Sequence, residues 1–432
     1  MAALAVVFAA CGNGVAPSTT QPRPPPTAPE VETLRANLAR ITNPNVTDEE
    51  LAALVAGNTA FAWDLFHLAR SEDENVFFSP YSIASALTMA LAGAKGDTAS
   101  EMRDLLHLEL SDDRVHAIRN GLDILIATSP DTFGDDDREP LTIQVANSLW
   151  GQAGYPFLDE FLNLLAANYD AGMNLVDYMA AAEEARQTIN TWVESMTEGR
   201  IVDLIPEGAV NGMTRLVLVN AIWFKGNWVN EFDLDRTTDA PFTLLDGTVI
   251  QVPLMRGGGN FLYGSGEGYQ SVSIPYAGDA AMVVILPDDG RFNEVAARLD
   301  PKEIARLHNS RGLRRVDLTF PKFEFRSNLG LNPILQSLGM TKAFESPGPE
   351  NGADFTGITA VKELFIAEVI HQAFVKVDEE GTEAAAATAI MIEATSAGPE
   401  PATVVIDRPF LFYIEHTSTG EILFMGQVVD PR

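Results

Sequence analysis

The sequence predicts an α+β fold, and three observations lead to this prediction. Helix-capping signals and helically spaced apolar residues gather toward the N-terminal side, and short segments rich in Val, Ile and Phe follow. No internal repeat is present, and no second linker interrupts the chain after residue 47. We therefore expect one large domain over residues 47–432, preceded by a segment of different character.

The first residues have the order of a secretion signal. Residues 1–10, "MAALAVVFAA", form an apolar run too short to span a bilayer but of the size of a signal-peptide core. Cys11, the one cysteine, follows at once, and a Pro/Thr/Ser-rich tether covers residues 11–46. This order resembles a bacterial lipoprotein signal with Cys11 lipidated, and it predicts an extracytoplasmic protein, secreted or anchored at the bacterial cell surface. Because Phe8 stands where Leu is usual and no Lys or Arg precedes the run, an ordinary cleaved signal and a cytoplasmic chain remain alternatives.

The first helices are predicted from capping signals and composition. Thr47 and Glu50 have the spacing of a capping box, and apolar residues then recur with helical period at Leu51, Leu54, Val55, Phe61, Leu65 and Phe66. Residues 79–94 carry no charge and are rich in Ser, Ala and Gly, which indicates a helix buried on all sides. Thr98 and Glu101 predict a second capping box that starts the next helix.

Alternating apolar segments predict the strands. They are "LTIQVANSLW", "TRLVLVNAIWF", "SVSIPY", "AAMVVILP", "VDLTFPKFEF" and the final pair "PFLFYIEH" and "EILFMGQVV" around the turn "TSTG". A helix, "AAAEEARQTINTWVESMTEG", lies among them and is closed by Gly199. The glycine clusters "RGGGN" and "GSGEGY" have no phosphate-site context, so we expect both to be turns.

Charge and motifs exclude several classes of function. The chain has 60 acidic and 29 basic residues and a formal net charge of −31, which argues against nucleic acid or an anionic membrane surface as partner. Membrane contact is expected only through a lipid on Cys11. None of the six histidines stands in an H-E-x-x-H arrangement, and no nucleophile elbow or phosphate loop is present. We therefore expect neither an enzyme nor a bound cofactor or metal.

Five segments carry a family resemblance. They are "NVFFSPYSIASALTMALAGAKGDTASEM", "LVLVNAIWFKGNW", "VDLTFPKFEF", "HQAFVKVDEEGTEAAAATA" and "RPFLFYIEHTSTGEILFMGQVVDP". In this order they resemble the signature segments of the serpins, over the chain from about Thr47 to Arg432. The resemblance implies a single domain of three β-sheets and eight or nine helices, with an exposed reactive loop at about residues 379–402. It also implies a monomeric suicide inhibitor that traps a target serine protease as a covalent acyl-enzyme.

The predicted loop has the pattern of a segment that becomes a strand. In inhibitory serpins the cleaved loop inserts into the largest sheet, so its residues must alternate between two faces. Counting from Gly381, one face is uncharged: Thr382, Ala384, Ala386, Thr388, Ile390, Ile392 and Ala394. The other face holds both glutamates: Glu383, Ala385, Ala387, Ala389, Met391, Glu393 and Thr395. The resemblance implies a hinge made of Glu380, Gly381, Thr382, Glu383, Ala384, Ala385, Ala386 and Ala387.

The resemblance also places the bond that a protease would cut. The usual spacing from the hinge glycine implies Thr395–Ser396, with Ala394–Thr395 as the near alternative and Met391 as a distant third. No Lys or Arg occurs from residue 381 to residue 407, so a trypsin-like enzyme would find no anchor. We expect an elastase-like or subtilisin-like target.

Further residues match the part of the family's sheet that opens. Ser79, Ser82, Asn220 and His371 match a hydrogen-bonding cluster beneath that sheet, and Trp228 matches a tryptophan where the loop first enters. For His371 alone, a hydrogen-bonded core histidine is the simpler interpretation and agrees with this role. The alternatives for the whole chain are a non-inhibitory serpin that acts as a chaperone or carrier, and a surface binding module.

Overall fold

The computed structural model describes residues 26–128, 141–348, 351–382 and 401–432. Within these ranges it contains nine α-helices and two hydrogen-bonded sheets, which confirms the α+β class and the expected number of helices. The helices are α1 (Asp48–Ala69), α2 (Pro80–Leu91), α3 (Gly96–Leu105), α4 (Asp112–Ala127), α5 (Asp159–Tyr169), α6 (Tyr178–Met196), α7 (Phe292–Arg298), α8 (Pro301–Ser310) and α9 (Asn332–Ser337), with the 3-10 turns η1 (Leu234–Arg236) and η2 (Lys342–Phe344).

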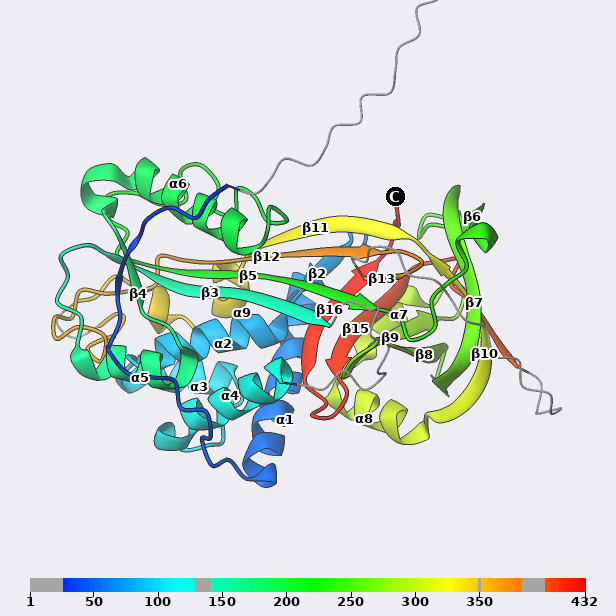
Figure 1. Ribbon diagram of the computed structural model, residues 1–432, viewed down its shortest axis with the longest axis horizontal. Coiled ribbons are helices and arrows are strands. Elements are labelled where there is room, and N and C mark those ends of the chain that lie inside the picture. Colours follow the sequence, from blue (N-terminus) through cyan, green and yellow to red (C-terminus); the bar gives the residue numbers. More distant parts are fainter. Residues whose placement is uncertain (1–25, 129–140, 349–350, 383–400) are drawn as a thin grey trace, which may run out of the picture.

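A seven-stranded sheet runs along the long axis of the molecule (Figure 1). Its strands are, in spatial order, β1 (Glu32–Leu34), β4 (Met173–Val176), β3 (Thr142–Gln152), β5 (Leu216–Asn227), β13 (Gly381–Thr382), β12 (Glu368–Val377) and β11 (Phe323–Gly330). Figure 1 shows α6 on one face of this sheet and α2 on the other. Apolar residues form a separate cluster on each face, so the sheet is buried on both sides.

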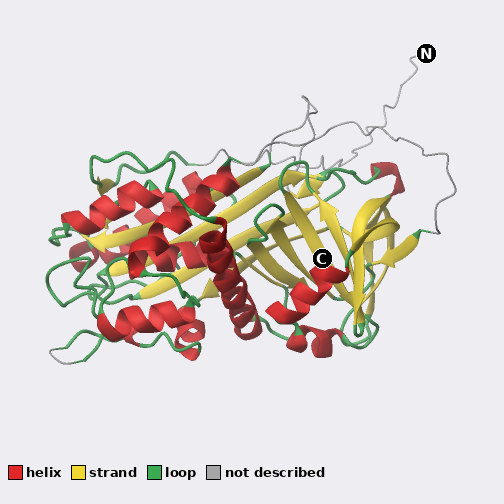
Figure 2. Ribbon diagram, turned by 90° about the horizontal axis from the view of Figure 1, so that it is seen from below, coloured by secondary structure: helices red, strands yellow, loops and turns green. Residues whose placement is uncertain are grey.

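A nine-stranded sheet forms the other end of the molecule, away from the helices that gather around the long sheet (Figure 2). Its order is β14 (Ala402–Val405), β10 (Gly312–Pro321), β7 (Val249–Gly266), β8 (Tyr269–Pro275), β9 (Ala280–Pro287), β15 (Phe410–His416), β16 (Ile422–Val428) and β2 (Val76–Phe78), and β6 (Thr238–Thr243) pairs with β7. The long strand β7 pairs with β6 and β10 first and with β8 only from Leu262 onward. One of the three expected sheets is thus the seven-stranded sheet. The other two are parts of the nine-stranded sheet, which the long strand β7 connects.

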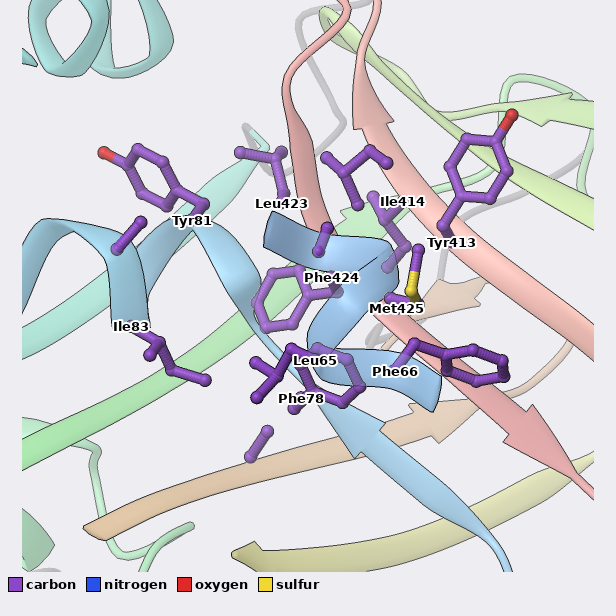
Figure 3. Packing of buried hydrophobic residues seen from close by; sticks show 14 of the residues in the cluster. Leu65, Phe66, Phe78, Tyr81, Ile83, Tyr413, Ile414, Leu423, Phe424 and Met425 are labelled. Atoms are coloured by element: carbon purple, nitrogen blue, oxygen red, sulfur yellow. The ribbon is translucent and has the colours of Figure 1, made fainter. Parts of the chain in front are cut away.

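The predicted first helices form as expected. At the start of α1 the Glu50 amide donates to the Thr47 hydroxyl at 3.2 Å, and the Thr47 amide donates to the Glu50 carboxylate at 3.0 Å. All residues of α2 are buried, as its lack of charge predicts. Figure 3 shows the packing between α1, represented by Leu65 and Phe66, and the strands that carry Phe78 and Phe424. This core holds the nine-stranded sheet against α1.

The capping box expected at Thr98 and Glu101 is wrong. Helix α3 begins earlier, at Gly96, and Thr98 is buried within its first turn. The Thr98 hydroxyl accepts the Asp354 amide at 3.0 Å, and the Glu101 carboxylate accepts the Thr341 amide at 2.7 Å. Both side chains therefore bind distant backbone groups instead of the start of their own helix.

The glycine cluster "RGGGN" is in a strand, so its prediction as a turn is also wrong. Gly257 and Gly258 belong to β7 and pair with β10. A Cβ at Gly257 would lie 2.9 Å from the ring of Phe232, and one at Gly258 would lie 2.8 Å from the carbonyl oxygen of Val316. Close packing across the strand explains these glycines. The second cluster does contain a turn, at Gly268, where φ is +77°.

Candidate functional site

The centre of the seven-stranded sheet is a pair of parallel strands with a short insertion at one end. Strands β5 and β12 pair directly from Val217 and Glu368 to Trp223 and Phe374. Beyond this point β13 lies between them and is antiparallel to both. A chain continued from Thr382 in the direction of β13 would have to separate β5 from β12.

The two residues of β13 fit tightly in this position. A Cβ on Gly381 would lie 2.0 Å from the carbonyl oxygen of Gly226, so only glycine fits there. Thr382 is 1% exposed, and its hydroxyl shares a hydrogen bond of 2.7 Å with the buried hydroxyl of Tyr276. The first residue of the predicted uncharged face therefore already lies inside the sheet.

Trp228 holds the turn that leads into β13. Its indole nitrogen donates to the carbonyl oxygen of Asp378 at 3.0 Å, and its amide donates to that of Glu380 at 2.8 Å. The indole is fully buried and stacks on Tyr276, with ring centroids 4.4 Å apart. The structure thus brings Trp228 together with three of the residues predicted to form the hinge, Glu380, Gly381 and Thr382.

An ion pair that the sequence reasoning missed secures the same turn. Lys322, between β10 and β11, contacts the carboxylate of Glu379 at 2.6 Å, and Glu379 is buried. Burial by itself raises the pKa of Glu379, but the hydrogen bond from Lys322 opposes it, and the pKa stays below its usual value. The sequence signal was available, because Lys322 is a lone cation in the apolar run "LTFPKF".

A hydrogen-bonded row crosses three strands of the sheet. His371 of β12 lies opposite Asn220 of β5, and Asn220 lies opposite Asn147 of β3. The three side chains are hydrogen-bonded in series. Nδ1 of His371 bonds the Asn220 side-chain oxygen, and the Asn220 side-chain nitrogen donates to the Asn147 side-chain oxygen. Asn147 was also missed, although it lies within a predicted strand. Separation of β5 from β12 would break the His371–Asn220 bond.

The row is tied to the start of α2. Ser82 accepts from the Asn220 amide at 2.7 Å and donates to the Asn147 oxygen at 2.8 Å. The Ser79 amide donates to Nε2 of His371 at 3.0 Å, and the Ser79 hydroxyl donates to a carbonyl of β16 at 2.6 Å. The four predicted cluster residues therefore lie together beneath the sheet. Asn220 is eight residues before Trp228, about 26 Å along the chain at roughly 3.3 Å per residue.

His371 is neutral in this cluster. It is fully buried, and burial lowers its pKa to about 3 despite the opposing effect of Asn220. Because Nε2 accepts the Ser79 amide, the proton must be on Nδ1, which donates to the Asn220 oxygen. Neither nitrogen has a free lone pair, so the ring has a structural and not a general-base geometry.

Several predicted residues lie outside the described residues. They are Cys11, the hinge residues Glu383, Ala384, Ala385, Ala386 and Ala387, and the residues of the predicted cleavage sites Ala394, Thr395 and Ser396. Within the described ranges, no group of His, Cys, Asp or Glu side chains could hold a metal ion. Among the described residues, the candidate site is therefore the seven-stranded sheet with the short strand β13 between β5 and β12.

Comparison with known proteins identifies this architecture. A family model described as serpin (serine protease inhibitor) matches residues 56–431. This chain belongs to the serpin family. Human leukocyte elastase inhibitor is 37% identical over 391 residues, which cover 88% of this serpin and 99% of that protein.

Two solved structures show the same fold. The thermophilic serpin tengpin in its native state has a TM-score of 0.78 at 26% identity, over 93% of this chain and all of that one. Human thyroxine-binding globulin in complex with its hormone has a TM-score of 0.76 at 30% identity, over 88% of this chain and 99% of that one. Serpins with different partners thus share this architecture.

Proposed function

We propose that this serpin is a suicide inhibitor of serine proteases with small or hydrophobic primary specificity. The observation that carries the proposal is β13, which starts a strand between β5 and β12 before any cleavage. An uncharged residue, Thr382, is the first to enter, and the same sequence face stays uncharged through Ala394. A strand so begun can extend only by moving β5 and β12 apart, which is the motion that inhibition requires.

The chemistry is that of the protease. Its serine Oγ attacks the carbonyl carbon of Thr395, the bond to Ser396 breaks, and the Ser396 nitrogen leaves as an amine with the proton carried by the protease histidine. The product is an ester between Thr395 and the enzyme. Water normally hydrolyses this ester, so the loop must insert first. Residues 381–395 as a strand would span about 50 Å at roughly 3.3 Å per residue, enough to carry the attached enzyme far from the cleavage position.

The loop sequence supports an elastase-like or subtilisin-like target. Thr395 or Ala394 would fill a small pocket, and no cation follows Gly381 until Arg408. A non-inhibitory serpin acting as a chaperone or surface binding module is the alternative. Such a protein has no need for an uncharged inserting face, so the buried Thr382 favours inhibition.

Incubation with elastase-like and subtilisin-like proteases tests the proposal. We expect a covalent complex that resists SDS, a released C-terminal peptide that starts at Ser396 or Thr395, and a one-to-one stoichiometry with monomeric serpin. Cleavage without complex formation by every enzyme would contradict it. A peptide that starts after Met391 would show that the predicted bond is wrong.

We further propose that the serpin acts outside the cytoplasm and is held at the cell surface by a lipid on Cys11. The apolar run and the tether in front of the domain support this location. Cys11→Ser should move the protein from the detergent phase to the soluble fraction, although one lipid modification is only one part of anchoring. A mature N-terminus well past Cys11 in mass spectrometry would contradict the anchor.

A further inference from the structure

Strand β5 carries two cations on the face of the sheet that points away from α2, which we call the outer face. Asn220 bonds Ser82 at the start of α2, so it points to the inner face. Because side chains alternate along a strand, Arg215 and Lys225, each five residues from Asn220, belong to the outer face. The four residues of β5 between them on this face are uncharged: Val217, Val219, Ala221 and Trp223. Two cations ten residues apart therefore flank an apolar row.

Strand β12 adds a third cation to the outer face. His371 accepts the Ser79 amide on the inner face, and Lys376, five residues later, therefore points to the outer face. The Lys376 ammonium contacts the Asp378 carboxylate at 3.3 Å, and 39% of its side chain is exposed. Since an ammonium has three donors, Lys376 can bind a second acid.

The sequence after Gly381 has two acids at the same spacing as the two cations of β5. Glu383 and Glu393 are ten residues apart, and the residues between them on their sequence face are uncharged: Ala385, Ala387, Ala389 and Met391. Thr382 belongs to the other sequence face and bonds Tyr276. It lies opposite a residue of β5 that shares the inner face with Asn220. As a strand continued from β13, the segment would therefore point both acids to the outer face.

Strand β13 fixes the register in which such a strand would continue (Figure 1). Its Thr382 pairs with Gly226 of β5 and, on the other side, with the last residue of β12, and both pairings are antiparallel. One residue further along, Glu383 would lie between Lys225 and Lys376. The parallel register of β5 and β12 places these two lysines level with each other. The first acid would therefore enter between two cations.

The same register brings the second acid to the remaining cation. Glu393 would lie opposite Arg215, one residue before the start of β5. The Arg215 guanidinium donates hydrogen bonds to the Tyr155 hydroxyl and to the carbonyl oxygens of Gly212 and Thr214, which are all neutral acceptors. One antiparallel register thus matches both acids with cations.

A slip of this register by two residues would keep each side chain on its face, but it is opposed in both directions. Slipped one way, Glu393 would lie opposite Glu368 of β12, acid against acid. Slipped the other way, Glu383 would lie between Trp223 and Phe374, whose rings are 3% and 6% exposed. Either slip would leave an attached enzyme about 7 Å from its final position at roughly 3.3 Å per residue.

We propose that Lys225, Lys376 and Arg215 are positioning residues that receive Glu383 and Glu393 and hold the cleaved loop in one register as it enters the sheet. This inference rests on the proposed inhibitory function and adds to it the residues that guide the strand. Each cross-strand ion pair contributes little alone, but a slip loses both pairs and adds repulsion or a buried charge. Insertion in one register is faster than insertion with slips that must be reversed, so fewer esters are hydrolysed.

The first test measures the ratio of free cleaved serpin to covalent complex with an elastase-like protease. Glu383→Lys and Glu393→Lys should each raise this ratio about fivefold, because repulsion replaces attraction and insertion slows. The increase should shrink in about 1 M salt, since these charges are only partly buried. Glu393→Lys combined with Arg215→Glu should restore the wild-type ratio. Glu400→Lys is the matched control, because it makes the same change in the loop beyond the predicted cut.

A second test measures the register with engineered cysteines, which is possible because Cys11 is the one native cysteine and can be replaced by serine. After cleavage, Ala387→Cys should form a disulfide with Ala221→Cys, because opposite residues of antiparallel strands have Cα atoms about 4.5–5.5 Å apart, within disulfide range. Ala385→Cys with Ala221→Cys is two residues out of register and should not form one. Mass spectrometry of a nonreduced digest identifies the linked peptides.

The outcomes separate this inference from the proposed function. Unchanged ratios in Glu383→Lys and Glu393→Lys, or a disulfide in the Ala385 pair instead of the Ala387 pair, would overturn the positioning role and leave inhibition intact. Failure of Arg215→Glu to restore the ratio of Glu393→Lys would overturn the match of these two residues. If the wild type forms no covalent complex with any enzyme and neither cysteine pair links after cleavage, the proposed function fails and this inference fails with it.

Discussion

Under the proposed function, replacement of Thr382 by arginine should convert this serpin from an inhibitor into a substrate. Thr382 is 1% exposed between β5 and β12, and its hydroxyl is bonded to Tyr276. An arginine there would place a charge in a buried site where the side-chain partner of Thr382 is the neutral hydroxyl of Tyr276. In the proposed mechanism, the cleaved loop must occupy this site first.

Two free energies compete when arginine replaces Thr382: the cost of burying its charge, and the contribution of the hydrogen bonds that keep β13 in the sheet. An unpaired buried charge costs about 3–5 kcal/mol. Of the hydrogen bonds that hold the inserted turn, three are made by residues 380–382: Thr382 with Tyr276, the Gly381 oxygen with the Asp378 amide and the Glu380 oxygen with the Trp228 amide. At a net 0.5–1.5 kcal/mol each, these three contribute about 1.5–4.5 kcal/mol. If about 3 kcal/mol of the charge penalty enters the barrier to insertion, insertion slows about 100-fold or more.

The assay measures which fraction of the serpin ends in the covalent complex and which fraction ends as free cleaved serpin. With an elastase-like enzyme, Thr382→Arg should give mostly cleaved serpin and free protease, because hydrolysis of the ester overtakes insertion. Thr382→Val keeps the shape and should remain an inhibitor with a modest loss of stability, about 1–3 kcal/mol for the unpaired Tyr276 hydroxyl. Glu383→Gln, on the opposite sequence face, is the matched control. A wild-type stoichiometry for Thr382→Arg would refute this assignment of the inserting face.

Three further changes test the hinge, the row across the sheet and the loop. Lys322→Met leaves the Glu379 carboxylate buried without its cation and should lower the stability of the uncleaved form by about 3 kcal/mol in denaturant unfolding, whereas an unchanged midpoint would show that the pair is dispensable. His371 has a pKa of about 3 in the native state and an ordinary pKa near 6.5 in the unfolded state. Between pH 6.5 and pH 3 the unfolded state therefore binds more protons, and the free energy of unfolding should fall as the pH falls through this range. His371→Asn should remove about 1.4 kcal/mol per pH unit of this slope, and parallel pH profiles of the two proteins would contradict the neutral assignment. Thr395→Arg should redirect inhibition to trypsin-like enzymes, and continued preference for elastase would place the cut elsewhere.

Local patterns were sufficient where neighbours in the chain decide the structure. The Thr47 capping box, the uncharged run of α2 and the alternating strands were all predicted, because each depends on periodicity and on groups within one turn or one pleat. The order of the signature segments also predicted the family, which the match over residues 56–431 shows.

Tertiary structure decided the features that depend on distant groups. Thr98 binds the Asp354 amide and so lies within a helix instead of capping it, and Gly258 lies in a strand because the backbone of β10 is close. The apolar run "VDLTFPKFEF" reads as one strand but divides at Pro321 between two sheets. Glu379 finds Lys322 across 57 residues of chain. A pattern in sequence reports only on the few residues beside it, whereas each of these outcomes depends on a hydrogen-bonding or packing partner that only the folded chain brings within a few ångströms.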